Sequence, residues 1–347
     1  MQELQKKISR RAASFAVAAL LAGVAASTAS ATQWRAFVGA QSPDLASHAL
    51  AFLPNEVWIH AGDSIRWTHT STAIHTVTFL TPGQIRPPNY GPIWGVPVGC
   101  PGNTPDGASF DGSSCVNSGI LGSTENSTTG LETYSVSFPT PGNFKLVCLV
   151  HTDMTGTVHV LKPSDTLPYD QDFYNREAQT DGAALVAEAL GLTGRGIAED
   201  NDGGSAVKVA AGVGEIVTTS GAGSQTASLA RFLRNVVIVR VGDTVEWTNL
   251  DSSEPHTVTF GTEPADPRPP SVNVSATPDG ALQATISSPS ESANSGVLKL
   301  AYQDRPNLAQ SPPGVTRFRV TFTAPGTFNY ICAIHDYLGM KGTVIVH

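Results

Sequence analysis

The amino-acid sequence predicts an all-β protein in which two tandem β-sandwich domains are joined by a partly helical linker. Three observations support this prediction. The second half of the chain repeats the first, each copy contains short segments of alternating apolar and polar residues, and Pro-Gly dipeptides mark turns between them. Glycine and proline number 33 and 24 among 347 residues, which favours many turns without reaching the composition of low-complexity disorder.

Residues 1–31 have the pattern of a secretory signal peptide. Basic residues precede an apolar run from Ala12 to Ala26, and the small residues Ala29-Ser30-Ala31 follow it. We therefore expect cleavage after Ala31 and a periplasmic or secreted protein. The pair Arg10-Arg11 weakly resembles a twin-arginine signal, so the export route stays open. A membrane anchor is the alternative, but the apolar run is short for a membrane span.

The charge balance argues against a nucleic-acid-binding protein. The formal net charge is −8, whereas a protein that binds nucleic acid needs a basic face. Removal of the signal segment, with its net charge of +3, would take the charge of the chain from −8 to −11. Such a chain would be steered toward partners with basic patches. After residue 30 no apolar run approaches a membrane helix, so we expect no stable membrane insertion after signal removal.

The internal repeat divides the chain into two copies. Four segments of the first copy recur in the same order in the second. The matched pairs are residues 52–68 with 232–248, 75–79 with 256–260, 117–121 with 294–298, and 141–144 with 325–328. Repetition of this kind predicts two homologous domains, at residues 32–162 and 204–347.

Each copy has the pattern of β structure. Residues 57–59 and 64–67 flank a turn at Gly62-Asp63, and the segments 134–138 and 318–322 alternate apolar with polar residues. Alternation of this kind gives each strand one apolar face, and such faces pack sheet on sheet in a sandwich. The expected core residues include Trp67 and Trp247.

The segment 163–203 joins the copies and belongs to neither. Its part from Asp170 to Leu192 contains the alanines, leucines and glutamates of a helix, and Gly194 and Gly196 follow. An acidic, glycine-containing stretch at 200–204 then leads into the second copy. The segment is therefore predicted to be a partly helical linker.

Each copy ends with a cysteine, a histidine and a methionine in close order between two expected strands, and has one further histidine upstream. The candidate metal ligands are His75, Cys148, His151 and Met154 in the first copy, and His256, Cys332, His335 and Met340 in the second. Two imidazoles, a thiolate and a thioether are the donors of a blue-copper site. The soft sulfur ligands favour Cu(I), while imidazole suits both copper states. The pattern predicts one copper ion in each copy.

On these motifs each copy resembles the cupredoxin family. The spacing C-x2-H-x2-M of the first copy is similar to that of amicyanin, and C-x2-H-x4-M of the second is similar to that of plastocyanin and pseudoazurin. The resemblance implies an eight-stranded Greek-key sandwich with one type 1 copper per domain, and an exposed edge of His151 and of His335 as electron port. Each copy departs from the small cupredoxins by an insertion, at residues 82–116 and 264–293, whose role stays open.

The resemblance implies an exported electron-transfer protein, not an enzyme, that shuttles single electrons between redox partner proteins through two type 1 coppers. The alternative is a copper oxidoreductase, similar to nitrite reductase or a multicopper oxidase, with an additional copper site at a subunit interface. Such enzymes need further histidines, commonly one beside the type 1 cysteine, but Cys148 and Cys332 have apolar neighbours and no H-x-H pair occurs. Copper storage is a third class, disfavoured because the sequence has only three methionines.

The remaining cysteines and histidines have less specific interpretations. Cys100 and Cys115 lie in the first insertion, and we expect them to form a disulfide in an oxidising compartment. Cys148 and Cys332 could instead be buried structural thiols or pair with each other, and Met154 could be a core residue. The histidines expected at the surface or in ordinary contacts are His48, His60, His69, His159 and His347, of which His69 is a candidate neighbour of the first site.

Overall fold

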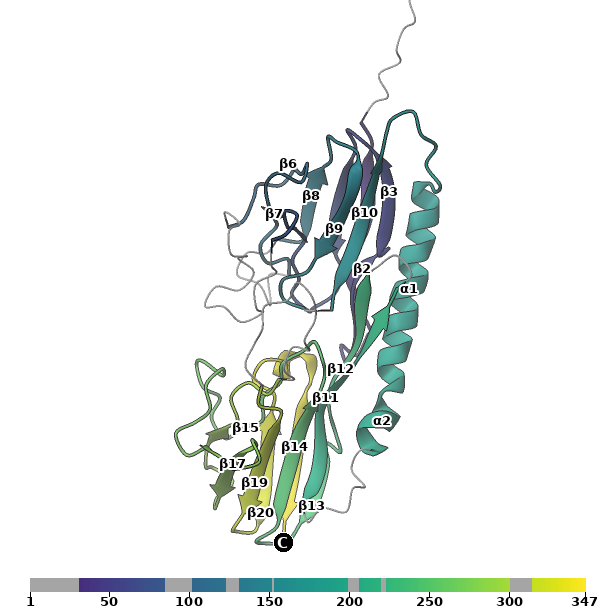
Figure 1. Ribbon diagram of the computed structural model, residues 1–347. Helices are drawn as coiled ribbons and strands as arrows, with labels where there is room; N and C mark the ends of the chain where they lie inside the picture. Colours follow the sequence, from purple (N-terminus) through teal and green to yellow (C-terminus); the bar gives the residue numbers. More distant parts are fainter. Residues whose placement is uncertain are drawn as a thin grey trace, which may run out of the picture. The chain divides into compact units, whose positions relative to one another are not determined.

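Strands dominate both copies, and the described part of the segment that joins them in sequence forms two helices (Figure 1). The computed structural model describes residues 31–84, 102–122, 131–151, 153–198, 206–219, 223–299 and 314–347. The all-β class with a partly helical linker is confirmed. The predicted signal peptide lies outside the described residues apart from Ala31, and so does the part of the first insertion at 85–101.

In its described residues the first copy contains ten strands, which form two sheets. They are β1 (Gln33–Gln41), β2 (Ser47–Leu53), β3 (Glu56–His60), β4 (Ser64–His69), β5 (Thr78–Phe79), β6 (Ala108–Ser109), β7 (Val116–Asn117), β8 (Thr133–Ser137), β9 (Gly142–Val147) and β10 (Thr155–Leu161). One sheet has the order β2-β1-β4-β8-β6, and the other has the order β3-β10-β9-β5-β7. The facing sheets enclose the core.

The second copy repeats this arrangement. Its elements are β11 (Val207–Thr218), β12 (Ser224–Leu233), β13 (Val236–Val239), β14 (Thr244–Leu250), β15 (Thr259–Phe260), β16 (Ser275–Ala276), β17 (Leu282–Ile286), β18 (Ala293–Asn294), β19 (Arg317–Phe322), β20 (Gly326–Ile331), the 3-10 turn η1 (Asp336–Leu338) and β21 (Lys341–Val346). The sheet orders are β12-β11-β14-β19-β17-β16 and β13-β21-β20-β15-β18. Strands β16 and β17 lie within the second predicted insertion.

The apolar faces of the strands form one core in each copy. Strand β4 alternates, with Ile65 and Trp67 buried between more exposed neighbours, and β19 does the same with Phe318, Val320 and Phe322. The predicted core residues Trp67 and Trp247 are 1% and 0% exposed. Burial of large side chains of this kind stabilises a domain by about 1.5–3 kcal/mol each. The two candidate cysteine ligands directly follow strands β9 and β20 of these sheets.

The two copies are joined by strand pairing. Strand β2 of the first copy pairs antiparallel with β12 of the second, from Leu50 opposite Thr226 to Ser47 opposite Leu229. A further pair joins β10 to β12 at Thr155 and Ser224. Hydrogen bonds therefore run from one sandwich into the other, and residues 31–347 form one compact unit.

Helix α1 (Gln171–Gly191) covers the junction of β2 and β12, and the short α2 (Thr193–Ala198) follows it (Figure 1). The side chain of Asp170 caps α1 by accepting a hydrogen bond of 2.8 Å from the backbone N–H of Phe173. The buried face of α1 consists of Tyr174, Ala178, Gly182, Leu185 and Ala189. Small residues on this face let the helix lie close to the sheet. No helix of the described ranges has the length and apolar character needed to cross a bilayer.

Candidate metal centres

Strand pairing brings the three ligands of the first site together. Cys148 directly follows β9, and the antiparallel partner β10 begins at Thr155, so the closing loop is the turn of a hairpin. His75 lies just before β5, whose Thr78 pairs with Val147 of β9. Because β5 and β9 are neighbours, the upstream histidine lies beside the closing loop although it is far away in sequence.

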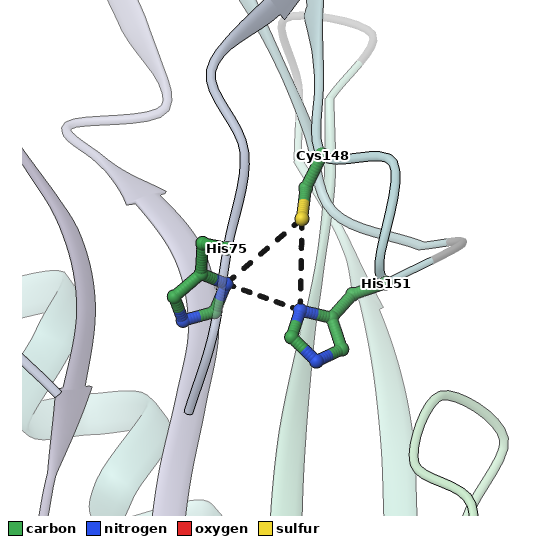
Figure 2. Close-up of side chains that lie close together, drawn as sticks. All are labelled: His75, Cys148 and His151. Atoms are coloured by element: carbon green, nitrogen blue, oxygen red, sulfur yellow. Dashed lines mark hydrogen bonds between the residues drawn. The ribbon is translucent and has the colours of Figure 1, made fainter. Parts of the chain in front are cut away.

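In the first site the ligand atoms of His75, Cys148 and His151 converge (Figure 2). The two Nδ1 atoms are 3.1 Å apart, and Cys148 Sγ lies 3.7 Å from His151 Nδ1 and 4.0 Å from His75 Nδ1. All three side chains are buried. The predicted two-histidine, one-cysteine group is therefore present and shielded from water.

The second site has the same geometry. His256 Nδ1 and His335 Nδ1 are 3.1 Å apart, and Cys332 Sγ lies 3.8 Å from each. These side chains are also buried. Within the described ranges these are the two groups of histidine, cysteine or acidic side chains close enough to hold one metal ion. Thiolate and imidazole donors in a dry, preformed triangle fit copper.

The methionines lie at the base of the same loops. Met154 and Met340 are fully buried, and their carbonyl oxygens accept hydrogen bonds of 3.0 Å from the backbone N–H groups of Cys148 and Cys332, respectively. Each methionine belongs to the same apolar cluster as its cysteine. This position is compatible with an axial ligand, and the ligand role of both methionines stays a prediction.

A second layer of hydrogen bonds, not predicted from the sequence, holds each cysteine. The backbone N–H of Thr76 donates to Cys148 Sγ at 3.4 Å, and the Thr76 hydroxyl accepts from Leu149 N–H at 2.8 Å. Thr257 does the same for Cys332, at 3.3 Å, and for Ala333, at 2.7 Å. These threonines belong to the repeated segments 75–79 and 256–260, so the repeat itself was the signal that could have identified them.

The repeated segments 117–121 and 294–298 form hydrogen bonds with the segments that carry the upstream histidines. Ser118 Oγ accepts a hydrogen bond of 2.9 Å from Val77 N–H, and Ser295 Oγ accepts one of the same length from Val258 N–H. The backbone N–H groups of the upstream histidines, His75 and His256, donate hydrogen bonds to backbone carbonyl groups of these segments. These segments therefore hold the backbone of the upstream histidines in place. Their recurrence in the sequence indicated that they matter, but it did not indicate this role.

Glycines with left-handed backbone lie behind the upstream histidines. Gly39 has φ +76° and Gly212 has φ +80°, and both lie at irregularities in the pairing of β1 and β11 with their neighbours. A Cβ atom on Gly39 would lie 2.8 Å from His75 Nε2, and one on Gly212 would lie 2.1 Å from His256 Nε2. Glycine is required there both for its conformation and for the close approach.

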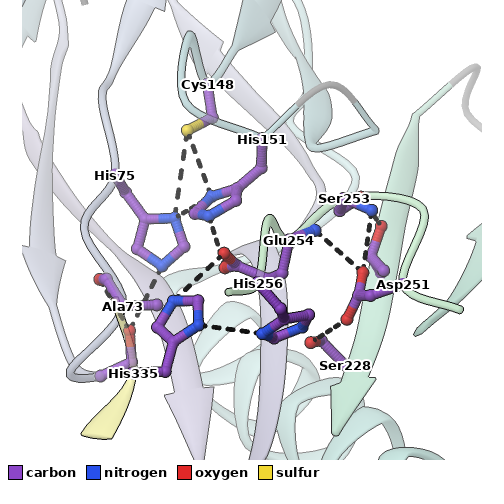
Figure 3. Close-up of polar contacts among 12 residues, drawn as sticks. Ala73, His75, Cys148, His151, Ser228, Asp251, Ser253, Glu254, His256 and His335 are labelled. Carbon is purple, nitrogen blue, oxygen red and sulfur yellow. Dashed lines mark hydrogen bonds and ion pairs between the residues drawn. The ribbon is translucent and has the colours of Figure 1, made fainter. Parts of the chain in front are cut away.

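The outer edges of the closing-loop histidines are buried, which contradicts the predicted exposed electron port. His151 and His335 are 1% and 7% exposed. Both face Glu254 of the second copy: His151 Nε2 lies 2.8 Å from one carboxylate oxygen and His335 Nε2 lies 3.6 Å from the other (Figure 3). The prediction was wrong because it treated each domain alone, whereas docking of the two copies covers both histidine edges.

Charge and hydrogen bonding favour the metal-binding form of both cysteines. Burial would raise the pKa of Cys148, but the hydrogen bond and charge of His151 outweigh it and lower the pKa to about 7. Burial of Cys332 is likewise outweighed by His256 and His335, which hold its pKa well below the usual range. The thiolate is the form that binds a metal ion.

The histidines of the first site shift in opposite directions. Burial and then the charge of His151 lower the pKa of His75 well below its usual value. Burial alone would lower the pKa of His151 too, but Glu254 and Cys148 raise it to about 10. His69 also contacts this site, since its ring centroid is 5.7 Å from that of His75 and its Nε2 is 2.7 Å from the carbonyl oxygen of Ala73. His69 therefore lies beside the first site and also has the local backbone partner expected of an ordinary histidine.

Cys148 and Cys332 are buried in separate sites and are not joined by a disulfide bond. Cys115 is buried, while Cys100 lies outside the described residues. The predicted disulfide between Cys100 and Cys115 therefore stays a prediction.

The match to one protein family supports the metal chemistry. Residues 40–161 and 219–347 match the model of a family described as copper binding proteins, plastocyanin/azurin family. No curated protein matches the chain. A solved Cu(I) form of an amicyanin variant is 18% identical over 42% of this chain and 87% of its own, with a TM-score of 0.23. Oxidised plastocyanin from Dryopteris crassirhizoma is 19% identical over 41% of this chain and 100% of its own, with a TM-score of 0.21. Because the family model spans most of both copies, this chain belongs to the plastocyanin/azurin family of copper-binding proteins.

Proposed function

We propose that this chain is an exported electron-transfer protein that holds one type 1 copper ion in each domain. The observation that carries the proposal is the pair of buried triangles of two histidines and one cysteine. His75, Cys148 and His151 would hold the first ion and His256, Cys332 and His335 the second, with Met154 and Met340 as axial ligands. Each copper ion would supply a Cu(I)/Cu(II) couple that gains or loses one electron.

The protein contributes preorganisation to this function. The N–H groups of Thr76 and Thr257 donate to the cysteine sulfurs, and the hydroxyl groups of the same threonines accept from the backbone N–H of the residue that follows each cysteine. Such contacts orient metal ligands and tune the metal they hold. Rigid ligands suit electron transfer because little rearrangement accompanies the change of oxidation state.

A carrier is favoured over a copper oxidoreductase by the contacts of three of the five other histidines. His60 Nε2 lies 2.8 Å from the carbonyl oxygen of Asp165, and His159 lies between Glu56 and Asn143. His69 contacts Ala73, as described above. These rings occupy separate places, each with a local partner, which is not the arrangement of an additional copper site.

Export and partners complete the proposal. The signal-like residues 1–31 would direct the chain to the periplasm or outside the cell, and the net charge of −11 without them would favour redox partners with basic patches. The two coppers would let the chain accept electrons from one partner and deliver them to another.

The test is copper content and visible absorption of the purified chain after copper loading and oxidation. We expect two copper ions per chain and the intense thiolate-to-copper band of a blue site. Cys148→Ser and Cys332→Ser should each remove one copper ion and about half of the colour. A chain that binds no copper would overturn the proposal, and colourless copper beyond two ions would favour the oxidoreductase alternative.

A further inference from the structure

One carboxylate lies between the two candidate metal centres. Each closing-loop histidine directs Nδ1 toward its own site, which leaves Nε2 on the outer edge of the ring. Both Nε2 atoms face Glu254, one at each carboxylate oxygen, at 2.8 Å for His151 and 3.6 Å for His335 (Figure 3). The first distance is that of a charge-assisted hydrogen bond, and the second is a close ionic contact.

This bridge is a feature of the second copy alone. Alignment of His75 with His256 places Ala73 at the position of Glu254. The second domain therefore supplies a residue to the ligand histidine of the first, and the first domain supplies no counterpart. Internal duplication explains the two sites but does not explain the residue between them.

Glu254 is held in place by a buried network. Asp251 accepts hydrogen bonds from the backbone N–H groups of Ser253, at 2.8 Å, and Glu254, at 2.9 Å, while Ser228 donates to its other oxygen (Figure 3). The side chain of Asn249 donates to the carbonyl oxygen of Glu254 at 3.0 Å. A buried carboxylate with this much support has a fixed position, because every change of its backbone would break several hydrogen bonds.

The interface around Glu254 leaves little open space. A small pocket of about 10 Å³, lined by His48, Ser228, Tyr337 and other residues around Glu254 and His335, has room for no more than about one water molecule. The pairing of β2 with β12 holds the two copies together beside it. An external redox protein therefore has no direct access to the histidine edges that face Glu254.

We propose that Glu254 is a positioning residue that couples the two copper sites through the chain His151–Glu254–His335. This inference rests on the proposed function. In the coupled step one electron leaves the reduced copper of one site and enters the oxidised copper of the other, so one ion is oxidised and the other reduced. No bond breaks, and the proton between His151 and Glu254 stays in its hydrogen bond. The two domains then act as one two-centre carrier.

The test measures electron exchange inside the full, copper-loaded chain. A rapid pulse of a small one-electron reductant, at less than one electron per chain, is followed by visible absorption. Cys148→Ser and Cys332→Ser provide the spectrum of each site, and Met340→Gln separates the spectra if they coincide, because the axial ligand tunes the site. We expect a first-order phase whose rate constant does not depend on protein concentration.

Three variants identify the role of Glu254. Glu254→Leu keeps the bulk but removes both contacts, and should slow this phase by about tenfold or more. Glu254→Gln keeps an acceptor oxygen and should retain more of the rate. Glu56→Gln is the matched control, because Glu56 pairs with His159 Nε2 at 2.8 Å outside both sites, and should leave the rate unchanged.

A second readout does not depend on electron transfer. In the metal-free chain, NMR should detect the His151 Nε2–H proton as a slowly exchanging, hydrogen-bonded signal that Glu254→Leu abolishes. An unchanged rate in Glu254→Leu, or a freely exchanging His151 proton in the unsubstituted chain, would overturn the inference. Two coloured copper sites without a concentration-independent phase would overturn it while leaving the proposed function intact, whereas absence of copper would overturn the proposed function itself.

Discussion

Gly212 lies directly behind His256, so close that a Cβ atom on the glycine would be 2.1 Å from His256 Nε2. The left-handed φ of +80° places the backbone of β11 in this position. Among the described residues His256 Nε2 has no hydrogen-bond partner, so contact with the glycine backbone fixes this edge of the ring. The shape of the second site thus depends on a residue that carries no side chain.

We predict that Gly212→Ala weakens copper binding at the second site and destabilises the chain. The new methyl group would displace the His256 ring, and the left-handed backbone would add a strain of about 1–2 kcal/mol. Gly280→Ala is the matched control, because Gly280 has φ +81° but nothing within 4 Å of its added Cβ. Urea unfolding should show destabilisation in both variants, and copper titration should show weaker binding in Gly212→Ala alone. Equal copper affinities would contradict the role of Gly212.

A second prediction concerns Ser118 and Ser295, which accept hydrogen bonds from the segments that carry the upstream histidines. Ser118→Ala leaves the buried N–H of Val77 without the acceptor that it has at 2.9 Å. An unsatisfied buried donor costs about 1–3 kcal/mol. The free energy of unfolding, measured by urea titration, should fall by that amount. Ser113→Ala, at an exposed hydroxyl that donates to Asp111, should change it little, and a similar loss in both variants would argue against a special role for Ser118.

A third prediction follows from the buried histidine beside the interface. His48 is 3% exposed, with Nε2 3.0 Å from the carbonyl oxygen of Leu45, and burial lowers its pKa to about 4 from an ordinary 6.5. Between these pH values the unfolded chain takes up a proton that the folded chain does not. Stability from this group is therefore present above pH 6.5 and is lost as the pH falls toward 4, by at most about 3 kcal/mol.

The variant His48→Gln removes this titration. The free energy of unfolding of the metal-free chain should then depend less on pH between 6.5 and 4 than in the unsubstituted chain. Chemical denaturation at several pH values measures the difference. Parallel pH profiles for the two chains would show that His48 does not titrate as expected.

A fourth prediction tests the contact between α1 and the sheet. A Cβ atom on Gly182 would already lie 3.1 Å from Leu53 and 3.3 Å from Ala40, so the larger Gly182→Val should overpack the junction and cost about 1–3 kcal/mol. Gly191→Ala at the end of α1 has open space and should be neutral or slightly stabilising. Thermal unfolding distinguishes the two. A stable Gly182→Val chain would mean that the helix can move away from the sheet at little cost.

The sequence was sufficient to identify both groups of two histidines and one cysteine because duplication displayed them twice. The closing motif around Cys148 recurs around Cys332 with two more residues before its methionine, each lies between two expected strands, and the upstream histidines recur at matching places. The all-β class and the helix after Asp170 followed from alternation and from helix composition. Alternation and helix composition are local signals, so neighbouring residues in the sequence were enough to reveal them, whereas the upstream histidines emerged only from comparison of the two copies.

Features that depend on the docking of the two copies were not predictable in this way. Glu254 has Ala73 as its counterpart, so the repeat gave no reason to select it, and its partner His151 is far away in sequence. Burial of the outer edges of His151 and His335 follows from the same docking, which is why the prediction of an exposed electron port was wrong. The left-handed backbone of Gly39 and Gly212 depends on irregular strand pairing that no alternation pattern reveals.

The pairing of β2 with β12 also bears on attempts to divide the chain. Strand β2 has β1 on one side and β12 on the other, so a fragment ending before the second copy would leave a row of backbone N–H and C=O groups open to solvent. An edge of this kind is a template for another strand. Two such fragments could pair with each other along β2, and a half-length protein made for spectroscopy would then assemble with itself in place of its missing half.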